Sequence, residues 1–252
     1  MRARRLAAAA AILGLAAIVS GALLTSIGVS LQPGQAAPRP DAHRVIAITA
    51  IALVIAAIVW GRSRAALSGA LLALLASAAV GWNFPLSPAA AVAHAALAHL
   101  FTAAIALALI GAPARAKDPI AAGPFAALRP ASLWAPPAVF TQIVMGALYR
   151  HQITGIMPHM LGAMAVALLT IVISAILLQN FSASKPLRRA AIALMTAVLV
   201  QICFGIAVFL LLLLNAGDTQ AFLWLATAHV ATGTLVLAAS ILTAIEVRRN
   251  LA

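Results

Sequence analysis

Four of the six histidines occupy matching places along the chain. His43 opens one apolar run and His94 lies early in another, while His159 and His229 hold the corresponding places in the second half. Neutral imidazole is a good axial ligand for heme iron, and two imidazoles on facing helices of a four-helix bundle could hold one heme between them. The pattern therefore indicates one candidate heme site in each half of the chain.

Taken alone, any of these histidines could be a hydrogen-bonded residue near a helix end with no ligand to hold. Their matched places on alternate apolar runs favour the ligand interpretation, because ionisable groups inside a membrane are costly and usually functional. His99 lies about 140° around a helix from His94 and about 7.5 Å further along it, so the two cannot face one iron. His151 follows Tyr149 and Arg150 between two runs, where it would meet a bound propionate or water.

The composition places these residues in a membrane. The chain is 65% hydrophobic and only 8% charged, with a mean hydropathy of +1.11, whereas a soluble domain carries roughly a quarter of charged residues. Lipid leaves backbone groups to be satisfied within each segment, so the spans are expected to be α-helices. The net charge of +12 comes from short basic clusters between apolar runs, which are topology signals rather than a nucleic-acid surface. The single cysteine, Cys203, lies in an apolar run and cannot form a disulfide within the chain or a thiolate cluster.

Eight apolar runs are long enough to cross a bilayer, which takes about 20 residues. The first follows an Arg-rich start but exceeds the apolar length of a signal peptide, so it is expected to be retained as a helix. The predicted spans are Leu6–Gly28, His43–Trp60, Ala66–Trp82, Ala89–Ile110, Leu133–Tyr149, Ile156–Leu178, Ala190–Leu214 and Ala221–Ile245.

The basic residues predict the orientation of these spans. With a cytoplasmic N-terminus, most of the 16 Lys and Arg residues fall on the cytoplasmic side, as the positive-inside rule requires. We therefore expect a multi-pass protein of a bacterial-type inner membrane, with both termini cytoplasmic and the four histidines toward the outer leaflet. The cytoplasmic segments hold Arg2, Arg4, Arg5, Arg62, Arg64, Arg115, Lys117, Arg129, Lys185, Arg188, Arg189, Arg248 and Arg249, and the outer ones hold Arg39, Arg44 and Arg150.

A proline-rich connection divides the chain into two halves. Residues 113–132 contain Pro113, Pro119, Pro124 and Pro130 and are expected to be a cytoplasmic linker. Residues 1–112 and 133–252 would each form a four-helix bundle. The repeated spacing Gln142-x-x-x-Gly146 and Gln201-x-x-x-Gly205 supports an internal repeat, although small residues that let helices pack closely would also explain the glycines.

The four acidic residues are Asp41, Asp118, Asp218 and Glu246, and none falls in mid-membrane. This distribution argues against a proton-driven transporter with a buried carboxylate relay. Asp41, two residues before His43, is expected to cap the helix or to serve as a catalytic acid.

Together these segments resemble the heme A synthase family, the membrane enzymes that make a cofactor of cytochrome oxidase. The resemblance runs through nearly the whole chain and is most specific between the fifth and sixth spans. The resembling segments are His43-Arg44, His94-Ala-Ala-Leu-Ala98, Gln142-Ile-Val-Met-Gly-Ala-Leu-Tyr-Arg-His151, Gly155-Ile-Met-Pro-His159, Gln201-Ile-Cys-Phe-Gly205 and Ala228-His229-Val-Ala-Thr-Gly233.

This resemblance implies an all-α integral membrane fold of eight helices, arranged as two pseudo-twofold-related four-helix bundles. His159 and His229 would bind the iron of a heme b cofactor, with Arg150 and His151 beside it. His43, His94 and Arg44 would bind the substrate, heme o, whose C8 methyl group is oxidised to the formyl group of heme a. Partners implied are the membrane lipid, a heme o synthase and oxidase assembly proteins.

The chain departs from the family pattern at one position that bears on catalysis. The family carries a glutamate three residues before the first histidine, where this chain has Pro40, with Asp41 next to it. Asp41 is thus the candidate catalytic residue. Two alternatives stay open: a heme-binding electron carrier or oxidase assembly factor without enzymatic activity, and a transporter whose histidines hold no heme.

Overall fold

The computed structural model describes residues 2–30, 40–60, 64–82, 85–111, 116 and 118–252, with only the backbone described at 28–30. These residues form eight α-helices and one short 3-10 turn, η1 (Gly123–Phe125). The helices are α1 (Arg2–Ser30), α2 (Asp41–Trp60), α3 (Arg64–Gly81), α4 (Pro88–Ile110), α5 (Leu128–Arg150), α6 (Ile156–Asn180), α7 (Lys185–Leu213) and α8 (Gln220–Asn250).

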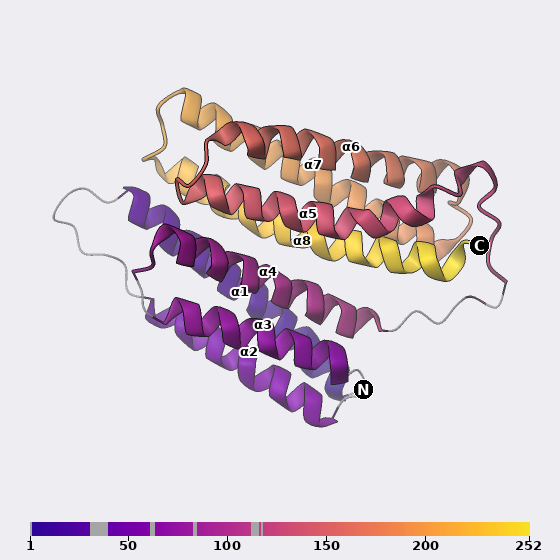
Figure 1. Ribbon diagram of the computed structural model, residues 1–252, viewed down its shortest axis with the longest axis horizontal. Helices are drawn as coiled ribbons and strands as arrows, with labels where there is room; N and C mark the ends of the chain where they lie inside the picture. The colour runs from indigo at the N-terminus through magenta and orange to yellow at the C-terminus, as the bar shows by residue number, and fades with distance from the viewer. Residues whose placement is uncertain (1, 31–39, 61–63, 83–84, 112–115, 117) are drawn as a thin grey trace.

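The first four helices pack side by side in one half of the molecule and the last four in the other (Figure 1). α1 begins and α8 ends at the same end of the molecule, and the even-numbered helices all start from the opposite end (Figure 1). α8 is the most enclosed helix, because it contacts α1 and α4 across the junction as well as α5 and α7 in its own half. The two halves therefore meet mainly along α8.

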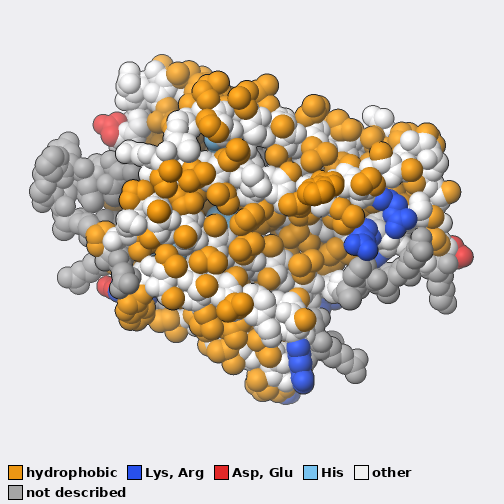
Figure 2. Space-filling view, viewed as in Figure 1, with side chains coloured by type: hydrophobic (Ala, Val, Ile, Leu, Met, Phe, Trp, Pro, Cys, Tyr) orange, Lys and Arg blue, Asp and Glu red, His pale blue; other side chains and the backbone are white. Residues whose placement is uncertain are grey.

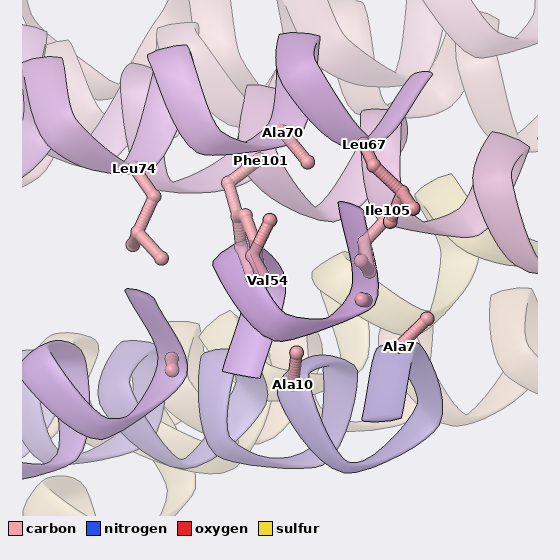
Figure 3. Packing of buried hydrophobic residues seen from close by; sticks show 10 residues of the cluster. Ala7, Ala10, Val54, Leu67, Ala70, Leu74, Phe101 and Ile105 are labelled. Atoms are coloured by element: carbon pink, nitrogen blue, oxygen red, sulfur yellow. The ribbon is translucent and has the colours of Figure 1, made fainter. Parts of the chain in front are cut away.

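Small side chains let the helices of the first half approach closely. Ala10 and Ala70 are fully buried there, in one cluster with Val54 and Phe101 (Figure 3). Ala50 of the same cluster is also fully buried. In membranes, where lipid is as apolar as leucine, such close van der Waals packing is the main force between helices. Phe101 fits because Gly14 of α1 faces it, where a Cβ would collide with its ring.

The outer surface of the helices is apolar. Leu72, Met164 and Leu168 are each more than 60% exposed, and hydrophobic side chains cover most of the face shown in Figure 2. Each of the eight helices is long and apolar enough to span a membrane. The fold is thus all-helical in the described residues and compatible with a multi-pass membrane protein.

Most helices extend beyond the apolar runs that predicted them. α1 already begins at Arg2, α7 begins at Lys185, and α8 continues through Arg248 to Asn250. A hydropathy criterion stops at the first charged residue, whereas Lys and Arg are good helix formers and continue the helix into the interface. The predicted positions of Arg39, Arg62, Arg115 and Lys117 lie outside the described residues.

Of the proline-rich connection predicted at 113–132, the structure describes residue 116 and the residues from 118 on. α5 begins at Leu128, because Pro130 falls in its first turn, where a missing N–H costs no helical hydrogen bond. Ile120 pairs with the end of α8: its N–H donates to the Asn250 carbonyl at 2.7 Å, and its carbonyl accepts from the N–H of Ala252 at 2.9 Å.

Candidate functional site

The four histidines at matched places form two pairs at the end of the molecule where the even-numbered helices begin. His43 of α2 lies beside His94 of α4, with ring centroids 5.9 Å apart and an angle of 69° between the rings. His159 of α6 lies beside His229 of α8 in the same way, at 6.2 Å and 85°. Each pair joins the two even-numbered helices of one half.

The spacing in both pairs suits two ligands on one metal ion. Two imidazoles that bind an ion from opposite sides, each with a nitrogen about 2 Å away, have ring centroids roughly 6 to 6.5 Å apart. No cluster of three or more His, Cys, Asp or Glu side chains suited to a metal occurs among the residues the structure describes. Heme fits a pair of ligands, because its porphyrin supplies the other four and the protein needs to provide only two.

Each histidine ring rests against a glycine of the preceding helix. A Cβ added at Gly81 would lie 2.6 Å from Cε1 of His94, and one added at Gly146 would lie 2.9 Å from Cε1 of His159. The corresponding distances are 3.2 Å from Gly21 to His43 and 3.0 Å from Gly205 to His229. Ordinary contact begins at 3.4 Å, so these glycines are what allows the four rings to sit against their neighbouring helices.

Hydrogen bonds from the same neighbouring helices orient the first pair. Nδ1 of His43 lies 3.0 Å from Oγ of Ser20, and Nδ1 of His94 lies 2.8 Å from the carbonyl oxygen of Ser77. Since a carbonyl can only accept, Nδ1 of His94 carries the proton and donates it. Nε2 of this ring is then the unprotonated nitrogen, as metal coordination requires.

Glutamine side chains take this place in the second pair. Nε2 of Gln142 lies 2.8 Å from Nδ1 of His159 and donates to the His159 carbonyl at 2.7 Å. Gln201 lies 3.3 Å from Nε2 of His229 and accepts through Oε1 from the hydroxyl of Thr232. Oε1 of Gln142 and Nδ1 of His229 are buried without a partner.

The two arginines near the pairs are already engaged by protein groups. Arg44 donates to the Trp82 carbonyl at 3.0 Å and lies over the Trp82 ring, 5.3 Å from its centroid, with its Nε buried and unpartnered. Arg150 donates to the Ala22 carbonyl at 2.7 Å and to Oγ of Ser26 at 2.5 Å. Arg150 therefore ties the end of α5 to α1, across the junction between the halves.

The remaining predicted residues fall outside the pairs. Asp41 is the exposed first residue of α2, so it sits in the first turn of the helix rather than at its cap. His151 follows α5 directly and is half-buried; burial, and then the charges of Arg150 and His94, lower its pKa. His99 is buried away from either pair, with Nδ1 2.7 Å from the Ala95 carbonyl of its own helix.

Three of the residues that contact the histidines share one spacing from the glycines, which residue types alone did not connect with histidine contacts. Ser77, Gln142 and Gln201 each lie four residues before the glycine that faces a histidine, one helical turn away on the same face. The recurring Gln-x-x-x-Gly spacing was visible, but its contact with histidine was not expected. Ser77-x-x-x-Gly81 carries the same signal with a different polar residue.

Comparison of the chain with protein-family models found no match. Comparison with curated proteins likewise found no relative. The inference of function therefore rests on the sequence pattern and on the geometry of the two pairs.

Proposed function

We propose that the protein is a heme A synthase-like membrane oxidoreductase that converts heme o to heme a with the help of a bound heme b. The observation that carries the proposal is the presence of two histidine pairs, at 5.9 and 6.2 Å, on equivalent helices of the two halves. This arrangement supports two heme sites in one chain, as an enzyme with a cofactor heme and a substrate heme needs. It also supports a pseudo-twofold relation between the bundles.

The second pair is assigned to the cofactor. His159 and His229 would bind the heme b iron, with Gln142 at Nδ1 of His159 orienting that ring. Gln201 would give up its contact with Nε2 of His229 when this nitrogen binds the iron. When bound, heme b supplies one-electron redox chemistry. A hydrogen bond at the second ring nitrogen of a metal-bound histidine tunes both the basicity of the ring and its affinity for the metal.

The first pair is assigned to the substrate. His43 and His94 would bind the iron of heme o from opposite sides and so fix the position of the ring relative to α1–α4. Ser77 holds His94 through both its backbone and its hydroxyl, which keeps the ring in one orientation. Arg44 would donate to a propionate through its guanidinium group. The donor would be either Nη2, in place of its bond to the Trp82 carbonyl, or Nε, which has no partner.

The proposed conversion replaces a methyl group by a formyl group. The oxidation proceeds by successive hydroxylations of the methyl carbon. Written with water, its balance is R–CH₃ + H₂O → R–CHO + 4 H⁺ + 4 e⁻, so an external electron acceptor must take up four electrons and the site must release four protons. Asp41, His151 and Asp218 are titratable groups at least partly exposed at this end of the molecule, and Asp41 and His151 are proposed to accept these protons. A heme held by His159 and His229 would supply the one-electron chemistry that carries the electrons toward this acceptor.

The setting proposed for this activity is a bacterial-type inner membrane. Both termini would be cytoplasmic and both heme sites would lie toward the outer leaflet, as the distribution of basic residues predicts. A heme o synthase would deliver the substrate through lipid, and oxidase assembly proteins would receive the product.

A second function is favoured by the surroundings of Asp41. The family's glutamate is replaced by Pro40, and the Asp41 carboxylate is exposed at the start of α2. A protein that binds heme at His159 and His229 but performs no oxidation would tolerate this change. In that case the chain would be an electron carrier or an assembly factor for cytochrome oxidase.

Heme analysis of the purified full-length protein tests both functions. The protein would be co-expressed with a heme o synthase, and its hemes extracted and identified by mass and by the pyridine hemochrome spectrum. His43→Ala and His94→Ala should abolish heme a and leave heme b, whereas His159→Ala and His229→Ala should remove heme b. His99→Ala is the matched control, because this histidine is buried but belongs to neither pair.

The outcomes separate the proposals. Heme b together with heme o, hydroxylated intermediates or heme a supports the enzyme. Heme b alone, unaffected by changes at the first pair, supports the carrier. A colourless protein contradicts both, because it would hold no heme. The spacing of the rings would then be an edge-to-face contact between two histidines, which needs no metal and spans the same range of distances.

A further inference from the structure

A groove runs between the two halves at the end of the molecule opposite the histidine pairs. It has a volume of about 790 Å³, within the range of roughly 300–1,000 Å³ typical of ligand sites. Helices α3, α4, α5 and α8 form its walls. None of its lining residues belongs to the histidine site, so the groove is independent of the proposed function.

The groove changes in chemistry along its length. Leu100, Leu107, Phe140 and Leu237 make its wall apolar toward the middle of the bundle, and Gly111 lies at its other end. From Leu100 to Gly111 the wall along α4 is about 16 Å long, at 1.5 Å per residue. Pro136 and Pro137 of α5 also line it, and prolines inside a helix interrupt its hydrogen bonds and loosen packing against a neighbour.

Two arginines stand at the end of the groove where both chain ends lie. Arg64 and Arg248 line it, both are exposed, and no acidic side chain lines it among the described residues. The neighbouring Arg249 is already neutralised by Glu246 at 3.0 Å and donates to the carbonyls that end α4. Basic side chains gather at this end of the face in Figure 2.

We propose that the groove binds one anionic phospholipid, with its phosphate held between Arg64 and Arg248 and an acyl chain lying along α4 between the two halves. Charge complementarity selects the occupant. A positive end without acid and a long apolar wall match a lipid with a negative headgroup, and basic pockets between membrane helices bind such headgroups. The lipid would fill the junction on the side where α4, α5 and α8 meet and stabilise the two halves against each other.

Native mass spectrometry of the full-length protein tests the proposal. The protein would be titrated with phosphatidylglycerol and with phosphatidylcholine of the same acyl chains. We expect preferential binding of phosphatidylglycerol, and about 10- to 30-fold weaker binding in the double variant R64A/R248A, since each arginine near a headgroup contributes roughly a factor of five. R188A/R189A is the matched control, because this exposed pair on α7 does not line the groove.

Two further variants separate charge from shape. R64K/R248K keeps the charge and should keep most of the affinity, while L107W fills the apolar wall and should weaken both lipids without altering charge. Equal binding by R64A/R248A and the unchanged protein would overturn the proposal, as would an equal loss in R188A/R189A. Displacement of the lipid by inorganic phosphate at millimolar concentration would also overturn it, because it would show a site for free anions.

Discussion

The contact between each histidine ring and a glycine makes the candidate site sensitive to a single methyl group. Gly146→Ala would place a Cβ 2.9 Å from Cε1 of His159, where ordinary contact begins at 3.4 Å, so the ring would have to move by about 0.5 Å. Metal–ligand distances tolerate about 0.2 Å. Displaced ligand orientation costs roughly 10- to 100-fold in metal affinity. We therefore expect heme b content to fall in this variant.

The four glycines form a graded series. The same comparison requires the ring to move by about 0.8 Å for Gly81→Ala, about 0.4 Å for Gly205→Ala and about 0.2 Å for Gly21→Ala. The matched control is Gly69→Ala on α3, where a Cβ would meet nothing within 4 Å. Alanine in a helix is favoured over glycine by roughly 0.5–1 kcal/mol, so the control should melt at a slightly higher temperature.

Heme content per protein and the thermal melting curve of the purified variants measure both effects. Gly146→Ala should lose more heme b than Gly205→Ala, and Gly69→Ala should lose none. Gly81→Ala should most impair binding of added heme o, with Gly21→Ala close to the unchanged protein. Full heme binding by Gly146→Ala, together with the melting temperature of the control, would refute the reasoning that these glycines position the ligands.

Three further perturbations follow from the site. Gln142→Leu removes the amide from Nδ1 of His159 and should weaken heme b binding about 10- to 100-fold, measured by heme titration. Burial, and next the charge of Arg150, lower the pKa of His151 below 6.5, so the unfolded chain takes up a proton that the folded one does not. Stability is therefore full above that pH and falls below it, and His151→Gln should flatten the decline in melting temperature between about pH 7 and 5. Arg150→Ala removes two hydrogen bonds between the halves and should destabilise the protein by about 1–3 kcal/mol, whereas Arg188→Ala should change stability little.

The number of helices followed from the sequence because each span is an uninterrupted apolar run of sufficient length. Their ends did not, because hydropathy cannot tell a basic residue that ends a helix from one that continues it. Lys185 starts α7 and Arg248 lies within the last turn of α8. The pairing of Ile120 with Leu251 was not predictable either, since it is a contact between distant segments that no local pattern records.

The sequence also indicated which histidines would lie together, because alternate helices start from the same end of the bundle. The surroundings of each ring were not predictable from residue type. Ser77 acts through its backbone carbonyl, which every residue has, and Gln142 acts through a side chain whose direction depends on helix packing. Arg150 contacts α1 of the other half, a partner that its place in the sequence did not indicate. A conclusion about partners on another helix needs the packing itself.

The pairing of Ile120 with the residues after α8 has a consequence for how the protein is made. During synthesis the connection between the halves emerges long before Asn250 and Ala252, its hydrogen-bond partners. The N–H and carbonyl of Ile120 therefore cannot form these hydrogen bonds until the four helices α5–α8 have been synthesised. Closing this contact joins the middle of the chain to the end of its eighth helix. Removal of residues 250–252 would thus keep all eight spans but remove the backbone hydrogen bonds that join Ile120 to the end of the chain.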